Sequence, residues 1–190
     1  RDGCTKGWQT MNETKYLIET KIEMQLIFRP KRDITEKAES KIKQIRQTTD
    51  FIIGVHIRHG DYQTWRNGRY YYSLEEFHQM MLQLQSLHPS ERVSFFISSN
   101  ADFDVNIFKE CHCFRFDKEP SGDILDLYTL SLCDRIIGPW STYSRWASFI
   151  GEVPLCFIKE KQQVFKDSDF SIVTDFYHFD LIIFDYNCCC

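Results

Sequence analysis

A group of polar and charged residues follows a short apolar run near residue 51. The run extends from Phe51 to Ile57, and the group around its end contains His56, Arg58, His59, Gly60 and Asp61. Arg58 offers a planar fork of N–H donors that matches phosphate oxygens, and Gly60 permits a sharp turn or a close approach to a ligand. The pattern predicts an anion site, although an edge strand followed by a charged surface loop explains the same residues.

Two further polar groups each follow a predicted strand. Residues Ser98 to Asn100 follow the apolar run Val93 to Ile97, and residues Ser141 to Ser144 follow the run Arg135 to Gly138. The second group opens a predicted helix, whose unpaired first-turn amides favour an anion. Because parallel strands bind ligands at their carboxyl ends, we expect all three groups to share one sheet edge and to form a nucleotide or sugar-phosphate site.

Asp126 is a carboxylate among apolar residues in a predicted helix from Asp123 to about Cys133. The side chains expected to face mostly inward are Ile124, Leu127, Tyr128, Leu130 and Leu132. Near the helix start, Asp126 would meet the positive end of the helix dipole. The alternative is a first-turn charge that faces solvent.

The predicted loop from His59 to Tyr72 combines arginines with aromatic residues, namely Trp65, Arg66, Arg69, Tyr70, Tyr71 and Tyr72. Aromatic faces beside guanidinium groups suit stacking on a base or a sugar. The alternative is that Tyr70 to Tyr72 simply pack the loop onto the domain.

Short apolar strands alternate with helices over most of the chain, which predicts an α/β fold with a doubly wound parallel sheet. The first of these helices begins at the capping box Ser73-Leu-Glu-Glu76. Its predicted buried face consists of Phe77, Met80, Met81 and Leu84. The predicted strands are 51–58, 93–97, about 113–116, 135–138 and 155–158, and the later helices are 123–133 and 142–150.

The segments before the first strand have helical character. Tyr16 to Phe28 has near-helical spacing of apolar residues and is followed by Pro30, which predicts its end. Asp33 to Gln47 predicts an amphipathic surface helix. Its apolar stripe is Ile34, Ala38, Ile42 and Ile45. Lys159 to Asn187 shows no clear periodicity.

The composition is that of an ordinary soluble globular chain, with 190 residues, 43% hydrophobic and 26% charged. A net charge of −4 argues against a broad nucleic-acid surface, so no nucleic-acid partner is expected. No apolar run approaches the roughly 20 residues of a membrane span, and we predict no transmembrane segment. The expected location is cytoplasmic. Because the first residue is Arg1 and not Met, the alternative is the Golgi lumen, if the source is eukaryotic and an N-terminal part is missing.

The eight cysteines do not suggest a disulfide framework or a metal centre. Cys111 and Cys113 flank His112, but no second ligand pair follows at zinc-finger spacing. No metal site is therefore predicted.

Several of these segments together resemble the GDP-fucose-dependent fucosyltransferases, with the α-1,2-fucosyltransferases as the nearest branch. His56-Ile-Arg-His-Gly-Asp-Tyr62 is similar to the family's His-x-Arg-Arg-Gly-Asp-Tyr motif. Gly7-Trp-Gln9 with Lys15-Tyr16 resembles the segment before that motif. Asp126 to Asp134 looks like the family's Asp-containing helix, and Gly138 to Ala147 like its Ser-x-Phe-Ser-Trp-Trp motif. The resemblance covers about residues 5 to 158.

The resemblance implies a lobe of the two-lobed glycosyltransferase B (GT-B) architecture. On this interpretation residues 1–49 form a partial N-terminal, acceptor-side region with linker helices, and residues 50–190 form a Rossmann-like nucleotide-sugar donor-binding domain. The implied reaction is an inverting transfer of fucose from GDP-fucose to a hydroxyl of a glycan acceptor. The expected partners are thus a nucleotide sugar and a glycan, with no cofactor and no essential metal.

The resemblance also assigns the two predicted catalytic residues. Arg58 would neutralise the donor diphosphate as it leaves, and Asp61 would orient Arg58 and brace the loop. The family has a second arginine where this chain has His59. This departure keeps two alternatives open: a non-catalytic or incomplete nucleotide-sugar-binding domain, and a transferase that uses another nucleotide sugar.

The remaining implied roles concern donor binding. His56 and Asp126 would hold the guanine, and Ser141 and Thr142 would bind phosphate or fucose. The full predicted donor-binding set is His56, Arg58, His59, Asn100, Asp126, Ser141, Thr142 and Ser144.

Overall fold

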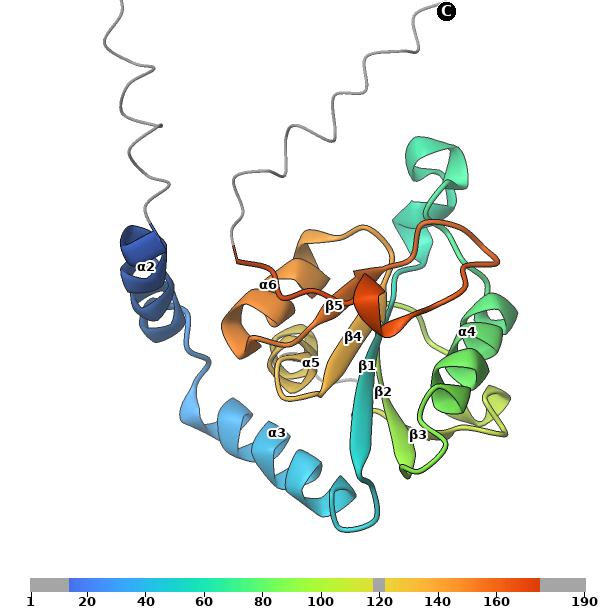
Figure 1. Ribbon diagram of the computed structural model, residues 1–190, viewed down its shortest axis with the longest axis horizontal. Helices are drawn as coiled ribbons and strands as arrows, with labels where there is room; N and C mark the ends of the chain where they lie inside the picture. Colours follow the sequence, from blue (N-terminus) through green and yellow to red (C-terminus); the bar gives the residue numbers. More distant parts are fainter. Residues whose placement is uncertain (1–13, 118–121, 175–190) are drawn as a thin grey trace, which may run out of the picture. The chain divides into compact units, whose positions relative to one another are not determined.

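The computed structural model describes residues 14–117 and 122–174 of the chain. Residues 30–172 form one compact unit, which carries the sheet and the predicted site (Figure 1). Helix α2 (Thr14–Ile27) is not part of that unit, and it confirms the helix predicted over Tyr16 to Phe28. The motif residues Gly7 to Gln9 lie outside the described residues.

A five-stranded, all-parallel sheet forms the centre of this unit, with the strand order β3-β2-β1-β4-β5. The strands are β1 (Phe51–Ile57), β2 (Val93–Ser99), β3 (His112–Phe114), β4 (Arg135–Gly138) and β5 (Leu155–Phe157). Every residue of β1 after Phe51 is buried, as expected of a central strand covered on both faces. The predicted fold class is confirmed.

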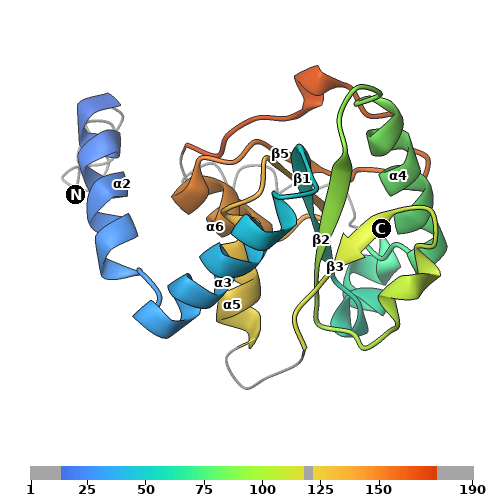
Figure 2. The same cartoon turned by 90° about the horizontal axis from the view of Figure 1, so that it is seen from below.

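Helices cover both faces of the sheet (Figures 1 and 2). Helix α4 (Leu74–Ser86) packs on one face, whereas α5 (Gly122–Leu130) and α6 (Thr142–Gly151) pack on the other. Helix α3 (Arg32–Ile45) lies against α5, where Ile34 and Ala38 are buried with Leu125. A right-handed crossover places its helix on one face of the sheet when the next strand is added on one side, and on the other face when it is added on the other side. The helices therefore change face where the chain stops adding strands beyond β2 and places β4 next to β1.

The first turn of α4 shows how directly the sequence sets a helix start. The Ser73 hydroxyl accepts a hydrogen bond from the Glu76 amide at 3.2 Å, and the Glu76 carboxylate accepts one from the Ser73 amide at 2.7 Å. The predicted capping box is confirmed. The predicted apolar face is also buried, with Phe77, Met80, Met81 and Leu84 all at most 2% exposed.

One prediction about packing was wrong, and one segment without a prediction turned out to be packed. In α5 the buried residues are Leu125, Thr129 and Leu130, whereas Ile124 is 48% exposed, because Leu125 rather than Ile124 packs against Ile34 and Ala38 of α3. The segment after β5, which showed no periodicity, pairs with β5 through an antiparallel bridge between Leu155 and Ser171 and buries Phe165 in the main core.

The remaining elements are short 3-10 helices, of which two lie in the loop between β1 and α4. They are η2 (Gly60–Gln63), η3 (Trp65–Gly68), η4 (Val105–Ile107) and η5 (Asp167–Asp169). The strand order reverses between β1 and β4, and the carboxyl ends of strands at such a reversal are where open α/β sheets bind ligands.

Candidate functional site at the carboxyl edge of the sheet

The three polar groups predicted from the sequence meet at this edge. His56 of β1 lies opposite Ser98 of β2 in the sheet register, and Val55 lies opposite Ile137 of β4. The loops that follow β1, β2 and β4 therefore leave the sheet side by side, as expected for parallel strands.

His56 is buried and joins β1 to α6. Its Nδ1 lies 2.7 Å from the hydroxyl oxygen of Ser144, and the two residues are 4% and 0% exposed. Burial, aided by the charge of Arg58, lowers the pKa of His56 to about 3, so the ring is neutral at physiological pH. The predicted contact of His56 with guanine stays a prediction, as does ligand binding by Ser144, because both side chains already hold each other in the interior.

The close approach of these two residues depends on Gly138 at the end of β4. A Cβ atom built on Gly138 would lie 3.0 Å from His56 Cβ and 3.3 Å from Ser144 Oγ. Glycine therefore lets the turn into α6 pack directly against β1.

Arg58 is held in one orientation by Asp61. Its Nε and one terminal nitrogen donate to the two carboxylate oxygens of Asp61 at 3.0 and 3.2 Å. The guanidinium also lies 5.6 Å above the ring of Tyr62. The Arg58 side chain remains 38% exposed, so the donors that do not face Asp61 can bind an anion.

Tyr62 links this loop to the start of α6. Its hydroxyl donates a hydrogen bond to the Trp140 carbonyl oxygen at 2.7 Å, and burial raises the pKa of Tyr62. Ser141 caps α6, because its hydroxyl accepts from the Tyr143 amide at 3.1 Å. Thr142 is exposed in the first turn, where amides and the helix dipole favour an anion.

His59 and Asn100 connect the loops after β1 and β2. The Asn100 side chain accepts from the His59 amide at 2.9 Å and donates to the His59 carbonyl at 3.2 Å. The ring Nε2 of His59 lies 2.9 Å from the Tyr72 carbonyl oxygen and therefore donates to it. The side chains of His59 and Asn100 therefore fix the backbone of the loop around Gly60, which has a φ of +65°.

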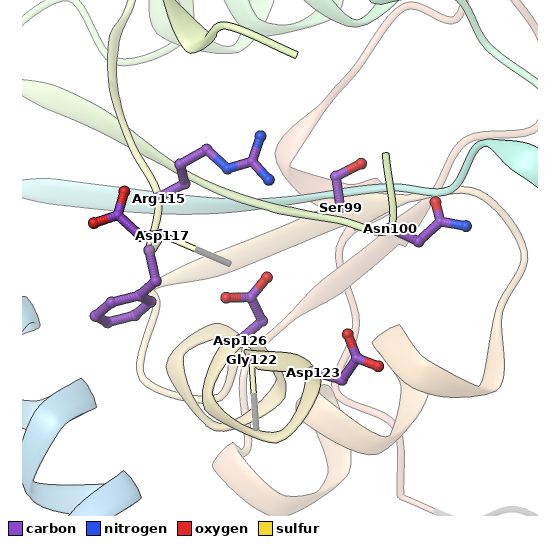
Figure 3. Close-up of a pocket in the computed structure, with 8 residues that line it drawn as sticks. Ser99, Asn100, Arg115, Asp117, Gly122, Asp123 and Asp126 are labelled. Carbon is purple, nitrogen blue, oxygen red and sulfur yellow. The ribbon is translucent and has the colours of Figure 1, made fainter. Parts of the chain in front are cut away.

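A pocket of about 310 Å³ opens beside Asn100, at the ends of β2 and β3 and the start of α5. Figure 3 shows the Asp126 carboxylate and the Arg115 guanidinium pointing into the same space, with Ser99 and Asn100 beside it. Its other lining residues are Phe116, Asp117, Gly122 and Asp123. The solvent-facing alternative for Asp126 is therefore wrong.

The environment of Asp126 changes its acidity. Burial raises the pKa of Asp126 to about 7, while Ser98 and Arg115 act in the opposite direction. A carboxyl that titrates near neutrality can accept hydrogen bonds from a ligand above its pKa and donate one below it. Such perturbed groups in a pocket mark functional-site candidates.

Sequence reasoning missed Arg115 and Tyr143. Tyr143 donates a hydrogen bond to the Asp123 carbonyl at 2.6 Å, and its ring lies 4.8 Å from that of His56. It thus fills the space between β1 and the start of α5. Arg115 lies near the end of the predicted third strand and directly follows β3, at the same edge as the other groups, and that position was the signal that could have identified it.

Within residues 14–117 and 122–174, no cluster of three or more His, Cys, Asp or Glu side chains is placed to hold a metal ion. None of the helices in that part of the chain is long and apolar enough to span a membrane.

Comparison with family models and with curated protein sequences finds no match. Solved structures do match. POFUT1 in complex with GDP has a TM-score of 0.53 and 17% identity over 78% of this chain and 51% of its own. POFUT1 in complex with GDP-fucose has a TM-score of 0.53 and 16% identity over 77% of this chain and 50% of its own. The fucosyltransferase NodZ from Bradyrhizobium has a TM-score of 0.44 and 14% identity over 78% of this chain and 64% of its own. A TM-score this low does not establish a shared fold.

At these identities the POFUT1 matches establish a shared fold and nothing more. The chain spans about half the length of the POFUT1 chains. The doubly wound sheet is therefore shared with POFUT1, while the substrate and the reaction have to be argued from the site.

Proposed function

We propose that this chain binds GDP-fucose and forms the donor-binding lobe of an inverting, α-1,2-like fucosyltransferase. One observation carries the proposal: the Tyr62–Trp140 hydrogen bond ties the Arg58 loop to the start of α6 at the strand-order reversal. Both elements suit phosphate binding, Arg58 through its fork of donors and α6 through its first turn. The shared fold with POFUT1 and the His56-to-Tyr62 motif support the same conclusion.

The diphosphate would lie between Arg58 and the first turn of α6. Arg58 is oriented by Asp61, and Ser141 and Thr142 stand at the helix start. In this proposal Asp61 is a positioning residue, because its carboxylate holds Arg58 and would repel phosphate. His59 and Asn100 act in the same way, by fixing the backbone of the loop next to Arg58.

The base would occupy the pocket that contains Asp126. Guanine presents two adjacent donors, its ring N–H and its amino group, and a carboxylate accepts from both. Asp126 points into the pocket from α5 (Figure 3). An adenine presents an acceptor in place of the ring N–H, so the same carboxylate disfavours it. The proposed donor therefore carries guanine.

The proposed reaction forms a bond between an acceptor oxygen and C1 of fucose while the bond from C1 to the diphosphate oxygen breaks. The bonding electrons leave with GDP, and the acceptor hydroxyl gives its proton to a base. Charge therefore develops on the diphosphate, where Arg58 and the α6 amides are already aimed. In this proposal residues 50–190 form the donor domain and residues 1–49 belong to the acceptor side, and no metal takes part.

Calorimetric titration with GDP, ADP and UDP tests this proposal. We expect GDP to bind most tightly, and Arg58→Gln to weaken it by about tenfold or more, because a charged hydrogen bond to phosphate is removed. Arg32→Gln is the matched control, since Arg32 is 90% exposed on α3 and pairs with Glu36 within its own helix. Equal affinity of wild type and Arg58→Gln for GDP would overturn the assigned role.

The second candidate is a domain that binds the nucleotide sugar without transferring the sugar. The observation in its favour is His59, whose ring Nε2 is directed to the Tyr72 carbonyl and is therefore not available to the phosphates. Incubation with GDP-fucose and a panel of glycan acceptors separates the candidates. Donor binding without release of GDP favours the second candidate, and turnover excludes it.

A further inference from the structure

The loop between β1 and α4 carries three aromatic rings in contact. The ring centre of Trp65 lies 4.9 Å from that of Tyr62 and 5.3 Å from that of Tyr70. Trp65 is 39% exposed, whereas Tyr62 is buried beneath Arg58. In Figure 1 this segment projects beyond the end of the sheet, above α4. The exposed aromatic group is therefore continuous with the proposed diphosphate site through Tyr62.

Two exposed arginines cover these rings. Arg66 Cζ lies 5.3 Å from the centre of the Trp65 ring, and Arg69 Cζ lies 5.5 Å from that of Tyr70. Among the described residues neither arginine forms an ion pair. The loop contains one acidic residue, Asp61, and Arg58 already binds it. A chain with net charge −4 thus presents a locally cationic aromatic surface at this edge.

The backbone keeps these groups in place against a conformational preference. Arg66 and Asn67 adopt left-handed conformations with φ of 49° and 57°. This region is unfavourable for most residues other than glycine, and such positions gather at ligand sites because the surrounding structure must hold them.

We propose that this cation–aromatic loop, made of Trp65, Arg66, Arg69 and Tyr70, binds an anionic saccharide that serves as the acceptor. The proposal rests on the proposed function, because it names the class of acceptor for that donor site. The saccharide carries a carboxylate or a sulfate on a pyranose ring.

Both halves of this chemistry are present in the loop. Trp65 is 39% exposed and offers aromatic surface to the C–H face of a sugar ring. Guanidinium forks bind carboxylate and sulfate oxygens in a bidentate manner. Arg66 and Arg69 can bind one or two acidic groups of a saccharide. Nucleic-acid binding usually requires a longer row of basic residues, which this acidic chain does not provide at the loop.

The test uses calorimetry with defined oligosaccharides in low salt and with GDP present. The probes are tetrasaccharides of hyaluronan, which carries carboxylates, and of chondroitin sulfate, which carries sulfates as well. Carboxyl-reduced hyaluronan tetrasaccharide is the matched neutral ligand. We expect an acidic probe to bind about tenfold more tightly than the neutral one, as charge-assisted hydrogen bonds require. A single-stranded oligouridylate is titrated in parallel.

The decisive variant is the double substitution Arg66→Gln with Arg69→Gln, whose side chains are exposed and whose loss leaves the core intact. It should lose most of the affinity for the acidic probe, while Arg32→Gln retains it. Trp65→Leu should weaken the acidic and the neutral probe alike, because it removes stacking rather than charge. Unchanged affinity in the double variant, tighter binding of oligouridylate, or displacement of the saccharide by GDP would each overturn the proposal.

Parallel GDP titrations separate this inference from the proposed function. The double variant should bind GDP as wild type does, because Arg58 and α6 are unchanged. GDP binding without saccharide binding refutes the acceptor proposal alone. Arginine-dependent saccharide binding without GDP binding refutes the donor proposal and keeps the saccharide site.

Discussion

The hydroxyl of Tyr62 donates a hydrogen bond to the carbonyl oxygen of Trp140 at 2.7 Å, across 78 positions of sequence. The same tyrosine lies under the guanidinium of Arg58. One side chain therefore positions the loop after β1 and the turn before α6 relative to each other. A ligand that needs both elements depends on this bond.

Replacing Tyr62 by phenylalanine should weaken GDP binding several-fold and lower the free energy of unfolding by about 1 kcal/mol, the net value of one such hydrogen bond. Tyr72→Phe is the matched control. The Tyr72 hydroxyl donates a hydrogen bond of 3.0 Å to the Ile158 carbonyl oxygen, which does not belong to the proposed site. Urea unfolding and GDP titration measure both effects. If both variants bind GDP equally well, Tyr62 contributes to stability only.

Gly138→Ala should destabilise the protein by about 1–3 kcal/mol, as overpacking of a core contact does. The added methyl would lie 3.1 Å from the His56 carbonyl oxygen and 3.3 Å from Ser144 Oγ, forcing β1 and α6 apart. Gly122→Ala is the control, because a Cβ there meets no atom within 4 Å. A denaturation midpoint for Gly138→Ala equal to that of Gly122→Ala would contradict this account.

Because of Asp126, we expect the free energy of unfolding to decrease as pH rises. Its pKa is about 7 in the folded state against 3.8 in the unfolded chain, so the folded state holds the extra proton between these values. The contribution is complete below pH 3.8 and is lost as pH rises through 7. Asp126→Asn should remove this dependence and become more stable than wild type above pH 7, by about 2–4 kcal/mol at most.

The same carboxyl predicts the pH dependence of GDP binding. The ionised form accepts from guanine, so affinity should rise as pH increases from 6 to 8, and Asp126→Asn should bind GDP weakly with little pH dependence. Titrations of GDP at several pH values measure this. A wild-type affinity that is constant over this range would exclude an ionised Asp126 from the base site.

His56 predicts the opposite dependence at lower pH. Its pKa is lowered from 6.5 to about 3, so the folded state binds fewer protons than the unfolded chain in this window. Stability from this group is present above pH 6.5 and is lost as pH falls towards 3, by on the order of 2 kcal/mol near pH 5. Unfolding of His56→Gln should be less sensitive to acid than unfolding of wild type, with exposed His112→Gln as the control. If unfolding of the two variants depended on pH in the same way, His56 would not be a source of the acid sensitivity.

The order of strands and helices was predictable because each element carries its own signal. The run from Phe51 to Ile57 is apolar throughout, and Ser73 and Glu76 satisfy each other's amides within one turn. Such local agreement needs no knowledge of the rest of the chain. The exposed Ile124 shows where this reasoning fails, and the buried Phe165 lies in a segment that carries no local signal, because packing rather than periodicity decided both.

By itself, the sequence determined the α/β class, the parallel sheet and the edge at which Arg58, Asn100 and Ser141 gather, since strand direction follows from alternation with helices. The tertiary structure alone decided how those residues are used. It buried His56 against Ser144, committed His59 to a backbone carbonyl, and placed Asp126 and Arg115 in one pocket. These are contacts between side chains far apart in sequence, and their distances and desolvation exist only once the chain has packed.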